Sequence, residues 1–197
     1  MCCICYESCV RYFSCFFVTK TSPKMCSRER PNVLITGTPA TGKTSICERI
    51  RRQLPDYEVM DVSHFCRNNG CIESHDNHLD TDIIDEDMLD EKLSPAIASG
   101  GYLVDHHSPS LIAKELIDVV FIMRCNNTLL YDRLKERSYS EVKITANIEC
   151  EIFETIVEEA VEWFGSDVCH QLTNETEEEL DTNCQKICDW IQKYKPK

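Results

Sequence analysis

Hydrophobic and polar residues follow two patterns along this chain, short apolar runs and longer stretches with helical spacing. The apolar runs are typical of buried strands and cover residues 33–35, 57–62, 101–105, 118–124 and 168–172. Apolar residues recur every three or four positions in the stretches 46–53, 63–69, 85–98, 127–137, 145–163 and 176–194. Strands that alternate with helices in this way predict an α/β domain with a parallel sheet and helices on both faces.

Two polar segments interrupt this pattern. Residues 73–82, ESHDNHLDTD, are acidic and have no period, so we expect a loop there. Residues 138–143 are predicted to form a second, shorter loop before the long helix over 145–163. For the helix over 63–69, Ser63 is the expected N-cap and Gly70 the expected end.

The stretch from Asn32 to Ile46 carries a phosphate-loop motif between the first strand and the first helix. Residues Gly37 to Thr44, GTPATGKT, match G-x-x-x-x-G-K-[ST]. Glycines let backbone N–H groups face an anion, and the helix N-terminus adds unsatisfied donors. We expect Lys43 to reach the β- and γ-phosphates of ATP and the Thr44 hydroxyl to bind Mg²⁺. A glycine turn with a surface lysine is the alternative, but the flanking strand and helix favour the phosphate site.

A second acidic residue is needed for Mg²⁺ at the end of a neighbouring strand. Asp105 follows the apolar run Tyr102-Leu103-Val104 and is the candidate. His107 stands two residues later, where an imidazole could orient the attacking group or take a proton. The alternatives are a strand-end cap for Asp105 and an ordinary loop histidine for His107.

Phosphoryl transfer concentrates negative charge, so arginines should converge on the site. Arg67 follows the second strand, Arg124 ends a strand, and the helix after it carries Arg133 and Arg137. All four are expected on the side of the sheet where such folds bind ligands. We expect Arg67 and Arg137 to take part, because Arg137 stands at the start of the loop over 138–143.

Charge and cysteine content narrow the class of protein. The 197 residues carry a formal net charge of -13, which argues against direct nucleic-acid binding, and no apolar run is long enough to cross a membrane. Residues 1–30 are basic and rich in cysteine, and we expect a disordered extension there, without a signal peptide or a zinc site. Met25 lies a few residues before the first strand and is a candidate alternative start. The cysteines scattered through the rest of the chain indicate a reducing compartment.

The segments GTPATGKTS, VDHH, LLYDRLKERSY and NIECEIFETIVEEA resemble the adenylate kinase isoenzyme 6 family, also called coilin-interacting nuclear ATPase. The resemblance covers Pro31 to about Tyr194. It implies a P-loop nucleoside-monophosphate-kinase fold with strand order 2-3-1-4-5, a monophosphate-binding segment over 61–84 and a short lid over 136–146 within a domain of residues 31–197. It also implies adenylate kinase and ATPase activity, a nuclear location with cytoplasm as a second one, and maturation of the small ribosomal subunit with a ribosomal protein as partner.

Carried over by position, the resemblance assigns nucleotide binding to the phosphate loop and its neighbours, Thr38, Pro39, Ala40, Thr41, Gly42, Lys43, Thr44, Ser45 and Arg137. Lys43, His107 and Arg137 are the expected catalytic residues, Arg67 the monophosphate ligand, and Thr44 with Asp105 the Mg²⁺ ligands. The chain departs from the family at Ala40, where glycine is common and where a β-methyl is tolerable if φ is negative. It also has Asn174-Glu175-Thr176 where the family has a lysine near the base, so the family's base contact from that loop is not carried over.

Two functions from different classes remain open. The first is a kinase that converts Mg·ATP and AMP to two ADP. The second is an assembly ATPase that grips a basic ribosomal protein and has weak kinase activity. Both need the same phosphate loop, so the segment 61–84 should discriminate between them.

Overall fold

The computed structural model describes residues 28–196, so the prediction of a disordered extension falls almost wholly outside the described residues. The last residues assigned to that extension contact the domain. The Arg28 guanidinium pairs with Asp118 at 3.2 Å, and the Arg30 guanidinium donates to the Asp56 carbonyl at 2.7 Å. The folded domain therefore includes residues before Pro31.

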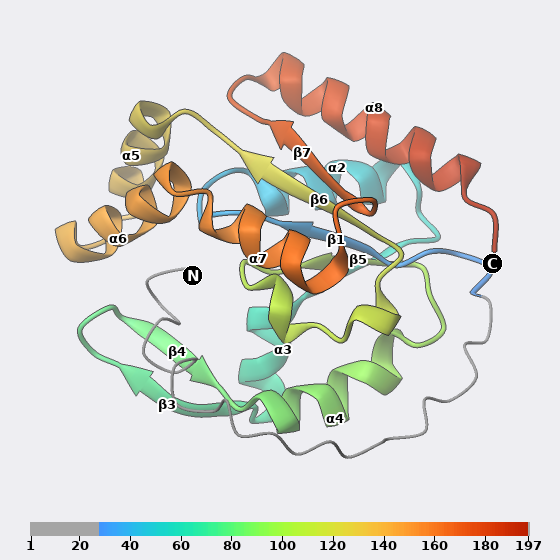
Figure 1. Cartoon of the computed structure of the whole chain (residues 1–197), viewed down its shortest axis with the longest axis horizontal. Helices are drawn as coiled ribbons and strands as arrows, with labels where there is room; N and C mark the ends of the chain where they lie inside the picture. Colours follow the sequence, from blue (N-terminus) through green and yellow to red (C-terminus); the bar gives the residue numbers. More distant parts are fainter. Residues whose placement is uncertain (1–27, 197) are drawn as a thin grey trace.

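Five parallel strands form the central sheet in the order β2-β5-β1-β6-β7 (Figure 1). The strands are β1 Val33–Thr36, β2 Glu58–Asp61, β5 Tyr102–Asp105, β6 Val119–Arg124 and β7 Cys169–Thr173. Counted along the chain without the separate hairpin, this is the order 2-3-1-4-5, and the predicted fold is confirmed. A parallel sheet gathers the carboxyl ends of all its strands at one edge, where ligands bind in such folds.

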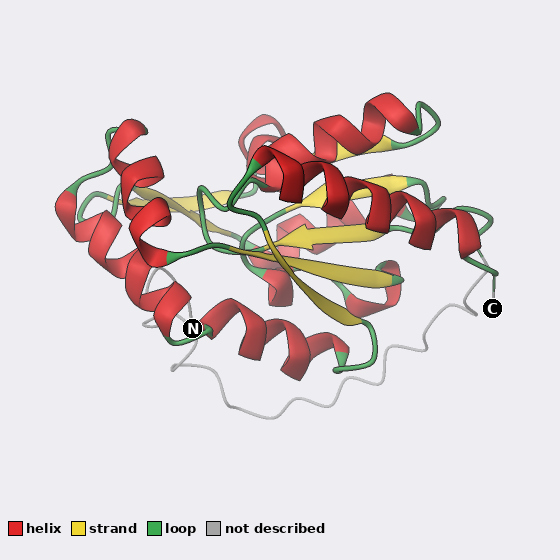
Figure 2. Cartoon of the chain, turned by 90° about the horizontal axis from the view of Figure 1, so that it is seen from above, coloured by secondary structure: helices red, strands yellow, loops and turns green. Residues whose placement is uncertain are grey.

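Helices cover both faces of the sheet (Figure 2). Helices α2 Lys43–Gln53 and α8 Glu177–Lys193 pack on one face, and α3 Val62–Asn69, α4 Glu86–Ile97 and α7 Thr155–Phe164 pack on the other. Successive residues of β1 serve opposite cores, since Val33 and Ile35 face the first pair of helices and Leu34 faces the other three. Two short 3-10 helices, η1 Pro109–Leu111 and η2 Lys114–Leu116, connect β5 to β6.

The prediction of a loop over 73–82 is wrong. Most of this segment belongs to an antiparallel hairpin, formed by β3 Ile72–Asp76 and β4 Thr81–Ile84. All its strand residues are exposed or half-buried, so it has no apolar alternation for sequence reasoning to detect. Backbone pairing holds it, and Nδ1 of His75 lies 2.9 Å from a carboxylate oxygen of Asp82 across the strands.

The prediction of a single helix over 145–163 is also wrong, because the structure has two helices there. Helix α6 Glu141–Ile152 begins inside the expected polar loop, capped by the Ser140 hydroxyl, and the chain turns at Glu154, whose φ is 54°, before α7. The apolar period continues across the turn, but its members enter different cores. Ile144 packs against α5 Asn127–Glu136, whereas Ile156 packs against the sheet.

Helix α3 has its N-cap two residues earlier than expected. Its N-cap is Asp61, whose carboxylate accepts the His64 N–H at 2.9 Å, and Ser63 lies inside the helix. The expected end is confirmed at Gly70, which has φ 68°. No helix among residues 28–196 is long and apolar enough to cross a membrane.

Candidate active site

The phosphate loop joins β1 to α2 at the carboxyl edge of the sheet, and close approach of the backbone requires both of its glycines. Gly37 has φ 135°, and a Cβ there would lie 2.3 Å from the Met123 carbonyl oxygen. Gly42 is the N-cap of α2 with φ 98°, and its Cβ would lie 2.2 Å from Asn174 Nδ2. The loop therefore has a compact turn that opens onto a helix N-terminus, which is the geometry of an anion site.

 Ala40 has φ 73°, in the left-handed region that favours glycine, so the negative φ at which its β-methyl would be tolerated without strain is not what the structure has. The residue is only 5% exposed and packs in a cluster with Cys125, Leu130 and Ile144. Buried apolar contact therefore offsets a strained backbone conformation at this position.

Lys43, Thr44 and Asp105 meet where β1 and β5 end side by side. The Lys43 ammonium donates to the carbonyl oxygens of Gly37 and Thr38 at 2.8 and 3.0 Å. The Thr44 hydroxyl donates to Asp105 Oδ2 at 2.6 Å. Burial raises the pKa of Asp105, and the nearby Lys43 charge partly opposes that rise. A hydroxyl and a carboxylate so placed form an oxygen pair that fits a hard divalent cation.

Two adjacent histidines follow Asp105. Burial, with the Lys43 and Lys143 charges, lowers the pKa of His107 to about 4, so its imidazole is neutral at pH 7. Burial also lowers the pKa of His106, whose ring lies 4.6 Å from that of His107. His107 therefore offers a neutral hydrogen-bonding group beside Asp105 and contributes no positive charge.

Two cavities flank the phosphate loop. The first, of about 430 Å³, lies between the loop, the hairpin and the start of α6, and its lining includes Lys43, Thr44, Arg67, Asp105, His107 and Arg137. The second, of about 520 Å³, has a lining that includes Gly42, Ser45, Arg133, Arg137 and Asn174. Arg137 lines both cavities. The arrangement can hold two phosphate-bearing ligands on either side of one guanidinium.

The structure thus gathers most of the predicted site residues around the first cavity, where Pro39 also lies. Ala40 and Ser45 border the second cavity, while Thr38 and Thr41 are buried within the loop. The segment 61–84 contributes α3 and the hairpin to the first cavity, and the expected lid over 136–146 is a short turn followed by the start of α6.

The other two arginines considered from the sequence serve the protein itself. Arg133 donates to the carbonyl oxygens of Asn174 and Glu175, each at 3.1 Å. Arg124 pairs with Glu151 and Glu154 at 2.5 and 3.1 Å. Neither side chain is therefore assigned to a ligand.

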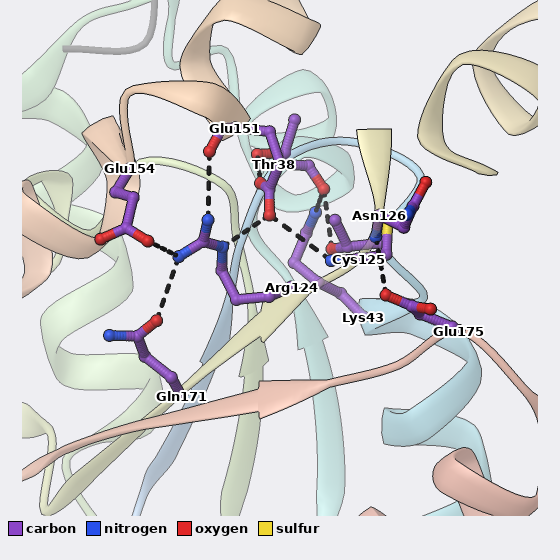
Figure 3. A network of polar contacts seen from close by, with 10 residues as sticks. Thr38, Lys43, Arg124, Cys125, Asn126, Glu151, Glu154, Gln171 and Glu175 are labelled. Atoms are coloured by element: carbon purple, nitrogen blue, oxygen red, sulfur yellow. Dashed lines mark hydrogen bonds and ion pairs between the residues drawn. The ribbon is translucent and has the colours of Figure 1, made fainter. Parts of the chain in front are cut away.

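Three residues that sequence reasoning did not single out also shape the site. Lys143 donates to the Asp80 carbonyl at 2.5 Å and so connects α6 to the hairpin across the first cavity. Asn174 donates from Nδ2 to the Thr41 carbonyl at 2.8 Å. Glu151 contacts Thr38 of the phosphate loop (Figure 3). The sequence pointed to two of them only indirectly. Glu151 lies in the segment NIECEIF, and Asn174 lies where the chain departs from the family pattern.

Comparison with known proteins agrees with this geometry. The family model described as an AAA domain matches residues 33–154. An adenylate kinase isoenzyme 6 homolog of Drosophila melanogaster is 40% identical over 168 residues, which cover 85% of this chain and 95% of that protein. A homolog of Caenorhabditis elegans is 39% identical over 171 residues, which cover 86% of this chain and 93% of that protein.

Solved structures support the fold. Shikimate kinase from Acinetobacter baumannii, in complex with shikimate, superposes with a TM-score of 0.54 at 17% identity, covering 85% of this chain and 97% of that chain. At this identity the likeness concerns the fold alone. The sequence relatives are closer and extend over nearly the whole described domain. This chain belongs to the adenylate kinase isoenzyme 6 family of P-loop proteins.

Proposed function

We propose that the protein is a nucleoside monophosphate kinase that converts Mg·ATP and AMP to two ADP. The observation that carries this proposal is the pair of cavities that meet at the phosphate loop, with Arg137 in the lining of both. A kinase must hold a donor and an acceptor with their phosphates together, and one cavity is available for each. The name of the relatives, adenylate kinase isoenzyme 6 homolog, supports ATP and AMP as the pair.

The role of each residue follows from its chemistry. Lys43 and Arg137 neutralise the charge that develops on the transferred phosphoryl group. Thr44 and Asp105 would hold Mg²⁺, which supplies further charge neutralisation when bound. His107, neutral at pH 7, orients the attacking group through a hydrogen bond. Arg67 on α3, in the lining of the first cavity, binds the acceptor phosphate.

We further propose ATPase activity and a role in maturation of the small ribosomal subunit, in the nucleus and also in the cytoplasm. A small-subunit ribosomal protein is the proposed partner. The exposed hairpin supports this second candidate, because Glu73 and Asp80 give it an acidic surface suited to a basic protein. In that case the protein is primarily an assembly ATPase with weak kinase activity.

The test is ADP production by the purified protein from Mg·ATP, with and without AMP and other monophosphates. Lys43→Met should abolish turnover, whereas Lys186→Met, on the exposed face of α8, is the matched control and should not. Strong stimulation by AMP, with two ADP formed per AMP consumed, supports the kinase. Slow turnover that ignores AMP contradicts it and favours the assembly ATPase. Turnover unaffected by Lys43→Met would reject the site itself.

A further inference from the structure

A buried carboxylate connects the phosphate loop to the end of α6 (Figure 3). Glu151 is 4% exposed, and its Oε2 accepts the Thr38 hydroxyl at 2.5 Å. Its Oε1 accepts Arg124 Nε at 2.5 Å and the Cys125 N–H at 3.4 Å. A buried carboxylate is costly unless it is paired and hydrogen-bonded, and this one is both.

Arg124 is fully engaged in holding this carboxylate in place. Its Nη1 donates to Glu154 Oε1 at 3.1 Å and to Gln171 Oε1 at 3.0 Å, and its Nη2 donates to the Glu151 carbonyl at 3.1 Å. The guanidinium therefore joins β6, β7 and the end of α6. Glu151 is held in a fixed orientation as a result.

The backbone carbonyl of Thr38 accepts several hydrogen bonds from within the phosphate-loop region. Its carbonyl oxygen accepts the Lys43 ammonium at 3.0 Å, the Thr41 N–H at 3.3 Å and the Thr41 hydroxyl at 2.8 Å. Its side chain is buried and lines neither of the two cavities beside the loop. The hydroxyl therefore serves to hold the loop and does not face a ligand.

We infer that Glu151 is a positioning residue, which acts through the Thr38 hydroxyl to hold the phosphate loop in its nucleotide-binding shape. This inference rests on the proposed nucleotide site. A loop that is already shaped spares the nucleotide the entropic cost of ordering it. Release of the loop should therefore weaken ADP and ATP binding by about tenfold, or about 1.4 kcal/mol. The KM for AMP should stay unchanged, because AMP is bound by other residues.

The test is a double-mutant cycle read out as the affinity for Mg·ADP by titration calorimetry. Thr38→Val and Glu151→Gln should each weaken binding by about tenfold, and the double variant should also be only about tenfold weaker than the wild type, not a hundredfold weaker. In other words, the double variant should match the single variants. Glu154→Gln is the control, because Glu154 also pairs with Arg124 but is exposed and does not contact the loop. A merely structural role would reduce the number of binding sites without changing their affinity.

Amide hydrogen exchange of residues 37–42 in the nucleotide-free protein keeps this inference separate from the proposed function. Glu151→Gln and Thr38→Val should both speed exchange in the loop, and Glu154→Gln should not. If the wild type fails to bind Mg·ADP but this exchange pattern holds, the proposed function fails and the anchoring role stands. If Glu151→Gln matches Glu154→Gln in both loop exchange and affinity, or if the two single effects add, the inference is overturned.

Discussion

The buried amide of Asn174 offers a sharp test of how the phosphate loop is supported. Asn174 is 4% exposed, and its Nδ2 donates to the carbonyl of Thr41, which is itself fully buried. This hydrogen bond ties the connection between β7 and α8 to the loop. The nearby Arg133 guanidinium is already bonded to the carbonyl oxygens of Asn174 and Glu175.

Two substitutions separate the loss of a donor from the gain of a charge. Asn174→Ala leaves the Thr41 carbonyl without its donor and should lower the free energy of unfolding by about 1–3 kcal/mol. Asn174→Asp places a carboxylate where Nδ2 now lies, 2.8 Å from that carbonyl oxygen. An uncompensated buried charge costs about 3–5 kcal/mol, so this variant should be the less stable one at pH 8.

The stability of Asn174→Asp should also depend on pH, and the direction of that dependence can be worked out. The protonated carboxyl can donate to the Thr41 carbonyl again, so the pKa of the new group should be raised in the folded state. A raised pKa contributes stability that is present at low pH and is lost as pH rises through the folded-state value. The deficit of Asn174→Asp relative to the wild type should therefore be smaller at pH 5 than at pH 8.

Urea denaturation of the wild type and both variants at pH 5 and pH 8 measures these differences. Comparing each variant with the wild type at the same pH removes the effect of the other titrating groups. The reasoning is refuted if Asn174→Asp is no less stable than Asn174→Ala at pH 8. A deficit that does not change between the two pH values would refute it equally.

Three further predictions concern the site and its loop. His107→Ala should lower kcat for ATP turnover by about a hundredfold with little change in the KM for ATP, and steady-state kinetics showing only a raised KM would contradict its orienting role. Arg67→Met should raise the KM for AMP but not for ATP in the same assay, and equal changes in both would remove Arg67 from the acceptor site. Ala40→Gly relieves about 1–2 kcal/mol of left-handed strain but loses a buried methyl worth about 0.8 kcal/mol and adds unfolded-state entropy, so urea denaturation should give a free energy of unfolding close to that of the wild type. A loss above about 2 kcal/mol would show that packing of the methyl outweighs the strain.

The main sheet and the phosphate loop could be predicted because local sequence carries their signals. An apolar run before Gly37 and a helical period after Lys43 place the loop, and strand ends such as Asp105 come together in any parallel sheet. The β3–β4 hairpin leaves no such signal, because its strand residues are all exposed or half-buried and its two strands are held together by backbone pairing. The turn at Glu154 is hidden for a different reason, because the same apolar period serves two separate cores.

The residues that support the site depend on contacts between distant parts of the chain. Glu151 reaches Thr38 across 113 residues of sequence, and Asn174 reaches Thr41 across 133. A buried glutamate on a predicted helix looks like any other polar residue until the helix is placed. Sequence reasoning could therefore find the residues that face the ligand more readily than the residues that hold them in place.

The cysteine thiols of the domain have a consequence for its chemical stability once it unfolds. The eight cysteines in the described part of the chain form no disulfide with one another, and seven of them are buried. Burial raises the pKa of Cys66 and Cys125 to about 11 and that of Cys188 to about 12, so these groups are protonated and unreactive in the folded state. Unfolding exposes them together and restores their ordinary reactivity. Each opening of the domain then exposes several thiols to alkylation or oxidation, and a molecule modified in this way cannot repack its core.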